Sequence, residues 1–215
     1  VVSGIAIMVI ALPLVQLIRH KPEDIGEVMD GIPHEPTTGD EGPYQEQYSF
    51  TWQEASRAPS FWLISAGHGL SLLTVSSLLM HLIPHLTKSL DYNLIDASYV
   101  FGMMTGTQLI GLFLGGYLGD RFEKRLLCVV CMIGHFIGLL AVTYATNVWW
   151  LAVFVLAHGL GWGVRGPMMV ALRADYFGPR SFGTIMGISS LIVMLGMTTG
   201  PIFCGWMFDQ HGNYE

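Results

Sequence analysis

The stretch LLCVVCMIGHFIGLLAVTYATNVWWLAVFVLAHGLGWGV, residues 126–164, contains no Asp, Glu, Lys or Arg. As a single α-helix it would measure roughly 58 Å, whereas the hydrocarbon layer of a bilayer is only ~30 Å thick. The stretch is therefore too long for one crossing and must turn back on itself. The polar segment TYATN, residues 143–147, is the natural place for the turn. The sequence thus predicts two antiparallel membrane-spanning helices here.

The rest of the chain repeats this pattern. Hydrophobic residues make up 52% of the sequence and charged residues 12%, about half the charged share of a soluble domain. Other charge-free segments, each at least as long as the ~18 residues that suggest a membrane span, are 1–18, 58–87, 97–119 and 181–208. We therefore predict an all-α, multi-pass transmembrane helix bundle with six spans, at about 1–19, 59–86, 97–119, 125–145, 148–173 and 181–208.

The distribution of basic residues predicts the orientation, because Lys and Arg accumulate on the cytoplasmic side of membrane proteins. Placing residues 20–57 inside the cell leaves only Lys88 in the outer loops. The inner segments then hold Arg19, Lys21, Arg57, Arg121, Lys124, Arg125, Arg173 and Arg180. The sequence thus predicts a protein of the plasma or inner membrane with its 20–58 connection in the cytoplasm.

Three parts follow from this reading: a helix at 1–19, a cytoplasmic loop at 20–58 and a bundle of five spans at 59–215. The loop is rich in Pro, Gly and acidic residues, so we expect disorder over much of it. Thr51 followed by Glu54 fits a capping box and predicts a short surface helix near 51–57. The absence of a basic patch argues against binding to nucleic acid.

Glycine pairs four residues apart recur in the last four spans, which predicts close contacts between helix backbones. Cys128 and Cys131 have CxxC spacing, but no second pair accompanies them and their setting is apolar. We interpret them as packing residues and predict no metal site or cofactor.

The segment GGYLGDRFEKR, residues 115–125, resembles the loop signature of the major facilitator superfamily of secondary transporters. The matching residues are Gly116, Asp120, Arg121, Lys124 and Arg125. The resemblance implies a gate, in which the glycine lets two helices touch and the charges pair while the inner mouth is closed. The alternative is that the basic residues only set the orientation in the membrane.

The same resemblance predicts partners for this loop. Asp175 should approach Arg121 or Lys124, and Asp120 should have its partner in the half of the transporter that this chain lacks.

Other segments extend the resemblance over nearly the whole chain. Residues 173–187 are similar to a helix connection of the monocarboxylate porters and oxalate/formate-type antiporters, and residues 20–31 and 50–62 resemble their central loop. The resemblance implies a C-terminal half, equivalent to the sixth to eleventh helices of the superfamily. Its partners would be the missing N-terminal half, the lipid bilayer and a small-molecule substrate. A helix-packing motif of the superfamily is matched by Gly187, Gly196, Gly200, Pro201 and Gly205.

Polar side chains inside spans are the expected substrate-binding residues, because such groups are rare in lipid and usually functional. No GxxxxGK[ST] phosphate loop is present, so we expect a secondary active transporter working by alternating access. Arg165 is interpreted as the group that attracts an organic anion such as a carboxylate. The other expected binding residues are His68 and Gln108, which we expect to share one cavity, and His158.

The sequence leaves alternatives open for the role of Arg165, for the coupling ion and for the function. Arg165 could instead snorkel toward the inner surface or pair with an acid near Asp175. Protons are an open choice of coupling ion, carried by a histidine, although His135 is expected to form a structural bond to a neighbouring helix. His81 and His85 are expected to be wetted surface groups. A non-transporting receptor or assembly subunit is the rival function. An enzyme is not indicated, because no paired acids or nucleophile with a base lie at a shared depth.

Overall fold

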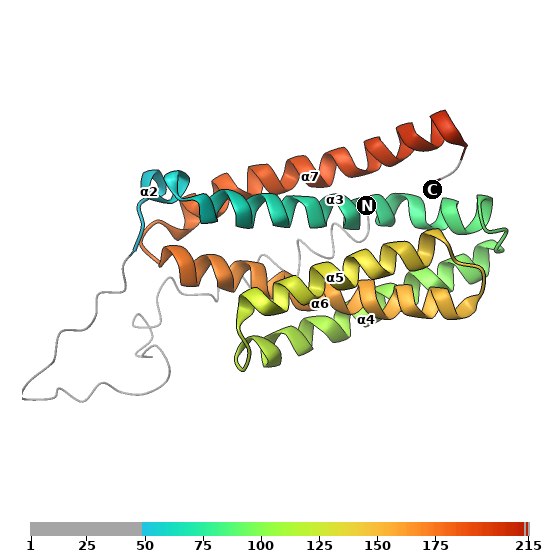
Figure 1. The fold of residues 1–215 in the computed structure, drawn as a ribbon, viewed down its shortest axis with the longest axis horizontal. Helices are drawn as coiled ribbons and strands as arrows, with labels where there is room; N and C mark the ends of the chain where they lie inside the picture. Colours follow the sequence, from blue (N-terminus) through green and yellow to red (C-terminus); the bar gives the residue numbers. More distant parts are fainter. Residues whose placement is uncertain (1–48, 213, 215) are drawn as a thin grey trace, which may run out of the picture. The chain divides into compact units, whose positions relative to one another are not determined.

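The computed structural model describes residues 49–212 and 214; the predicted first span and most of the 20–58 loop lie outside them. This part contains the helices α2 (Trp52–Arg57), α3 (Pro59–Lys88), α4 (Leu94–Gly119), α5 (Lys124–Thr143), α6 (Val148–Phe177) and α7 (Phe182–His211) (Figure 1). Within the described residues, α3 to α7 are each long and apolar enough to cross a membrane. The predicted all-α, membrane-spanning architecture is confirmed.

The helix ends are set by local capping rather than by the limits of the charge-free segments. Helix α4 begins at Leu94, three residues earlier than predicted, because the Asn93 side chain accepts a hydrogen bond from the Asp96 backbone at 2.8 Å. Helix α6 continues to Phe177, four residues beyond the prediction. It ends at Gly178, whose φ of 70° lies in the left-handed region that favours glycine. Each helix therefore extends past its apolar segment and includes charged residues.

Helix α2 begins with the predicted capping box. The Thr51 hydroxyl accepts from the Glu54 backbone N–H at 3.3 Å, and the Thr51 backbone N–H donates to the Glu54 carboxylate at 2.8 Å. This backbone donor, with the Thr51 hydroxyl, holds the pKa of Glu54 below its usual value.

An apolar cluster fastens α2 to the bundle. Ala55 is buried together with Phe61 of α3, Phe177 of α6 and Ile185 of α7. The backbone of Phe50 also donates to the carbonyl of Phe177 at 2.9 Å. We call the end formed by residues 49–58, 120–125 and 178–181 the basic end, because it carries Arg57, Arg121, Lys124, Arg125 and Arg180.

The five long helices pack in two groups. Helix α3 lies along α7, while α6 packs between α4 and α5 (Figure 1). Contacts between the two groups are much sparser than contacts within them. The sequence predicted five spans here but not which of them would be neighbours.

Glycines determine how closely the helices approach, but only some of the predicted pairs do so. Gly196 and Gly200 of α7 lie against the backbone of α3 at Gly69 and Leu73. Between α4 and α6, Gly111, Gly115, Gly159 and Gly163 make similar close approaches. An added Cβ at Gly102, Gly106, Gly183 or Gly187 would meet nothing within 4 Å among the described residues, so close approach at these glycines stays a prediction. Gly116 of the loop signature also faces open space. These glycines lie on faces of α4 and α7 that no described helix covers.

Substituting Gly163 by alanine should destabilise the bundle. A Cβ at this position would overlap the Gln108 carbonyl oxygen and approach the Leu112 backbone nitrogen of α4. Backbone atoms cannot move aside cheaply, so we expect a loss of about 1–3 kcal/mol and a lower Tm in detergent. The matched control is Gly166→Ala in the same helix, where an added Cβ meets nothing within 4 Å. Equal Tm values for the two variants would contradict the observed packing.

Candidate functional site

Helix α6 buries two arginines. The side chains of Arg165 and Arg173 are each 1% exposed, and they lie eight residues, about two helical turns, apart. Neither forms an ion pair within the described residues, where the salt bridges are Lys124–Asp175 and Arg125–Glu123. A buried cation is costly unless an opposite charge accompanies it. Within the described residues, no acidic side chain compensates either charge.

Arg173 joins the two groups of helices. Its Nε donates to Ser189 Oγ of α7 at 2.9 Å, its Nη1 to the Met169 carbonyl at 2.8 Å, and its Nη2 to His68 Nδ1 of α3 at 3.1 Å. Ser189 Oγ in turn lies 2.8 Å from Ser65 Oγ. Every nitrogen of the guanidinium is thus hydrogen-bonded, but each of its partners is neutral.

Arg173 was not among the site residues expected from the sequence. It was placed at the end of its predicted span and counted with the basic groups of the inner side, whereas α6 continues to Phe177 and buries it. The only signal in the sequence was the absence of a helix breaker before Gly178 and Pro179.

Arg165 begins a hydrogen-bonded chain between α6 and α5. Its Nε donates to His135 Nε2 at 3.3 Å, and His135 Nδ1 lies 3.0 Å from His158 Nδ1. The His158 ring stacks on Phe154. Two buried nitrogens of this chain, Arg165 Nη1 and His158 Nε2, have no hydrogen-bond partner in the described part of the protein.

Both open alternatives for Arg165 are therefore wrong in this structure. Arg165 does not snorkel, because its side chain is 1% exposed. It forms no ion pair with an acid near Asp175, because Asp175 pairs with Lys124.

The remaining predicted binding residues are only partly brought together. His158 joins Arg165 through His135, and His135 makes the expected bond to a neighbouring helix. His68 contacts Arg173 rather than Gln108. Among the described residues no hydrogen bond joins His68 to the half-buried Gln108, and their sharing of one cavity stays a prediction. The role of His135 as the link between Arg165 and His158 was missed, because it depends on how α5 and α6 face each other.

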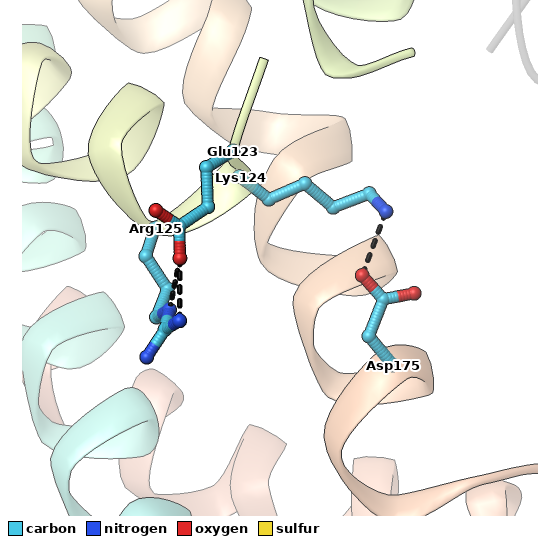
Figure 2. Close-up of polar contacts among 4 residues, drawn as sticks. All are labelled: Glu123, Lys124, Arg125 and Asp175. Carbon is cyan, nitrogen blue, oxygen red and sulfur yellow. Dashed lines mark hydrogen bonds and ion pairs between the residues drawn. The ribbon is translucent and has the colours of Figure 1, made fainter. Parts of the chain in front are cut away.

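Four predicted gating residues lie at the basic end: Asp120, Arg121, Lys124 and Arg125. Figure 2 shows the ion pairs of Lys124 and Arg125. Lys124 Nζ lies 2.6 Å from Asp175 Oδ2 and so joins the start of α5 to the end of α6, one of the two contacts expected for Asp175. Arg125 pairs with Glu123, two residues away in the sequence, at 2.5 Å. Arg121 lies instead over the Tyr117 ring, 4.2 Å from its centroid. Asp120 is the exposed C-cap residue of α4.

Two histidines near the other end of α3 are not the wetted surface groups that the sequence predicted. His85 is buried and its Nε2 donates to the Val142 carbonyl of α5 at 3.0 Å. His81 lies between the Pro201 carbonyl and the Tyr214 hydroxyl, each at 3.0 Å. Burial raises the pKa of Tyr214, which keeps its hydroxyl a donor. These groups line a mainly apolar cavity of about 330 Å³.

The described residues contain no candidate metal-binding site. Within the described ranges no group of three or more His, Cys, Asp or Glu side chains is placed to hold a metal ion. Cys128 and Cys131 are buried and free, as packing residues would be.

Comparison with known proteins identifies a family. The family model described as Major Facilitator Superfamily matches residues 64–214, well over half of the chain.

Individual relatives match shorter segments. "Multidrug resistance protein B homolog" of Mycobacterium tuberculosis is 31% identical over 97 residues, which cover 45% of this chain and 18% of that protein. "Putative glycerol-3-phosphate transporter 4" of Arabidopsis thaliana is 33% identical over 116 residues, covering 48% and 21%. "Triacylglyceride transporter" of Mycobacteroides abscessus is 27% identical over 119 residues, covering 54% and 22%.

The chain thus spans about a fifth of the length of these curated relatives. None of the three bears the name of a monocarboxylate porter or an oxalate/formate antiporter. The comparisons therefore support the superfamily but not the subtype that the sequence suggested.

Substituting Ser189 by alanine should destabilise the protein. The change removes the acceptor of Arg173 Nε and the partner of Ser65, and it leaves a buried donor unpaired. We expect a loss of about 1–3 kcal/mol, read as a lower Tm in detergent. Ser190→Ala is the matched control, because the neighbouring Ser190 is exposed. Similar Tm values for both variants would argue against a structural bond between Arg173 and Ser189.

Proposed function

The chain belongs to the Major Facilitator Superfamily, and from this premise we propose that it forms part of a secondary active transporter for a small organic anion. Two helical bundles rock around a central site, so that the site opens to each side of the membrane in turn. A gradient of an ion or solute drives the movement. The partner bundle is an N-terminal half of the same protein, as the resemblance to the sixth to eleventh helices implies.

The two buried arginines support the proposal that the substrate is an anion. Arg165 and Arg173 bring two positive charges into an apolar bundle, and no carboxylate among the described residues neutralises them. Arg165 Nη1 and His158 Nε2 are also buried without an acceptor. An anion whose oxygens accept from these groups would satisfy both the charges and the hydrogen bonds.

Two classes of anion fit this chemistry. A carboxylate is the substrate that the sequence pattern favours, and a phosphate ester is suggested by the name of the relative from A. thaliana. Guanidinium groups bind either anion through paired hydrogen bonds. Both classes belong in the first transport assay.

The basic end acts as the inner gate in this proposal, with residues 20–58 in the cytoplasm and the protein in the plasma or inner membrane. The pair Lys124–Asp175 fixes the start of α5 on α6, so that the loop at 120–123 is held in place. Asp120 and Arg121 are exposed at this loop, free to meet the N-terminal half when the inner mouth closes. Gly116 faces open space on α4, where a helix of that half could pack closely.

Transport should depend on Arg165. We would reconstitute the full-length protein in liposomes and measure uptake of lactate, oxalate and glycerol 3-phosphate, with ethidium as a cationic probe. Arg165→Gln should lower kcat/KM for the transported anion more than tenfold, because charge-assisted hydrogen bonds are worth about 1.5–3 kcal/mol. Lys88→Gln is the matched control, since Lys88 is exposed at the opposite end of the bundle, at the last residue of α3.

The outcomes separate the alternatives. Unchanged anion uptake by Arg165→Gln would remove Arg165 from the binding site. Transport of ethidium without any anion would show that the substrate class is wrong. No flux of any probe would favour the receptor or assembly subunit.

The gate should respond to the ion pair between α5 and α6. Lys124→Asp and Asp175→Lys each place like charges together, so each should slow transport, and the double exchange should recover part of the rate. The pair is partly exposed, with side-chain exposures of 30% and 51%, so its effect on stability should stay below about 1 kcal/mol. Glu123→Gln is the control, because its partner Arg125 lies in the same segment. A double variant as slow as the singles would count against the pairing.

A further inference from the structure

The chain from Arg165 through His135 to His158 has only one arrangement of its hydrogens. An arginine Nε donates and never accepts, so His135 Nε2 must be the acceptor. The neutral His135 ring then carries its hydrogen on Nδ1 and donates to His158 Nδ1. The neutral His158 ring in turn carries its hydrogen on Nε2. Both unpartnered nitrogens, Arg165 Nη1 and His158 Nε2, are therefore donors.

A proton cannot be added to the hydrogen-bonded chain of Arg165, His135 and His158 without breaking one of its hydrogen bonds. A proton on His135 Nε2 would place two donors face to face at Arg165 Nε. A proton on His158 Nδ1 would face the hydrogen of His135 Nδ1, and if that hydrogen moved to Nε2 it would again meet Arg165. Every protonated form therefore loses one of the two hydrogen bonds. Repulsion between the new charge and the guanidinium favours loss of the bond to Arg165.

The surroundings provide no internal counter-charge. The ionisable groups near the chain are Cys128 and Cys131 on α5, His68 on α3 and Arg173 on α6. In the central stretches of α4 and α7, residues 97–119 and 182–208, there is no Asp, Glu, His, Lys or Arg. Within the described residues, a protonated histidine pair would be accompanied by two arginines and no carboxylate. The missing negative charge must come from outside the described residues.

We propose that His135 and His158 form a proton-binding site that is mutually exclusive with the hydrogen bond from Arg165 to His135. Binding of a proton releases Arg165, and the released guanidinium captures the anion. The anion supplies the missing negative charge and so strengthens proton binding. Because coupling between two sites is reciprocal, proton and anion favour each other's binding. The inference rests on the proposed function and specifies its mode as proton–anion symport.

The arrangement of hydrogens can be measured without any substrate. Solid-state NMR of the full-length protein with ¹⁵N-labelled histidine, in lipid nanodiscs, distinguishes Nδ1–H from Nε2–H rings. The signals are assigned with His135→Gln and His158→Gln. At neutral pH we expect His135 as the Nδ1–H form and His158 as the Nε2–H form. On acidification the pair should take up one proton in one step. An Nε2–H form of His135, or independent uptake of two protons, would overturn the inference from the wild-type protein alone.

Two variants compare the guanidinium that contacts His135 with one that does not. Arg165→Met and Arg173→Met each delete one buried guanidinium of α6, but only Arg165 contacts His135. Loss of the hydrogen bond and of the nearer charge should raise the proton affinity of the histidine pair about tenfold more in Arg165→Met than in Arg173→Met. Equal changes in both variants would refute the exclusion.

Uptake measurements test the symport. In liposomes, an inward proton gradient should accelerate uptake of whichever of lactate, oxalate or glycerol 3-phosphate is transported. His135→Gln keeps an acceptor for Arg165 but cannot bind the proton, so Arg165 is not released. Uptake by this variant should fall and should no longer respond to the proton gradient. Uptake of an anion that ignores the gradient would refute the symport and leave the proposed function intact. If none of the three anions moves, the proposed function fails, and the NMR titration still decides whether proton and Arg165 exclude each other.

Discussion

The burial of two positive charges without an acidic partner among the described residues is the constraint on which the rest of the bundle depends. Arg165 and Arg173 are inside a stack of apolar helices, where an uncompensated charge costs several kcal/mol. The two arginines differ in how fully hydrogen bonds compensate this cost. Arg173 is surrounded by neutral acceptors that satisfy its donors and fasten α6 to α3 and α7. Arg165 keeps an Nη1 that has no partner among the described residues, and its Nε donates to His135. Arg173 thus serves the architecture, and Arg165 is available for the proposed binding of an anion.

Close packing of α5 on α6 makes the chain of Arg165, His135 and His158 possible. Gly138 of α5 lies against His158, and an added Cβ there would come within 2.8 Å of the His158 Cβ. Gly161 of α6 similarly approaches the backbone of Cys131. Without these glycines the two helices would stand further apart, and the two imidazole rings could not reach the 3.0 Å contact that joins them. The small residues therefore act on function through the distance they allow between neighbouring backbones.

The two groups of helices meet through few polar contacts. Near the basic end Arg173 bridges α6 to α3 and α7, and near the other end His85 of α3 donates to α5. Between these points the groups share few contacts, while inside each group glycines and apolar side chains interlock. The ion pair of Lys124 and Asp175 acts within one group and fixes the loop that resembles the superfamily signature. Polar groups in this bundle thus mark the places where helices are joined, and apolar contacts give the bulk of the packing.

Sequence patterns predicted the class of the fold, the approximate spans within the described residues, the capping box at Thr51 and Glu54, and the approach of Asp175 to the loop signature. These features depend on local composition, on capping chemistry or on a motif that is short in sequence. Only the tertiary structure decided that Arg173 is buried, that His135 links Arg165 to His158, and that Gly196 is packed while Gly187 is not. In helices that are apolar all round, the sequence pattern does not show which face meets a neighbour. The rotation of each helix is set by the helix it packs against. This rotation also decides which side chains surround each buried polar group.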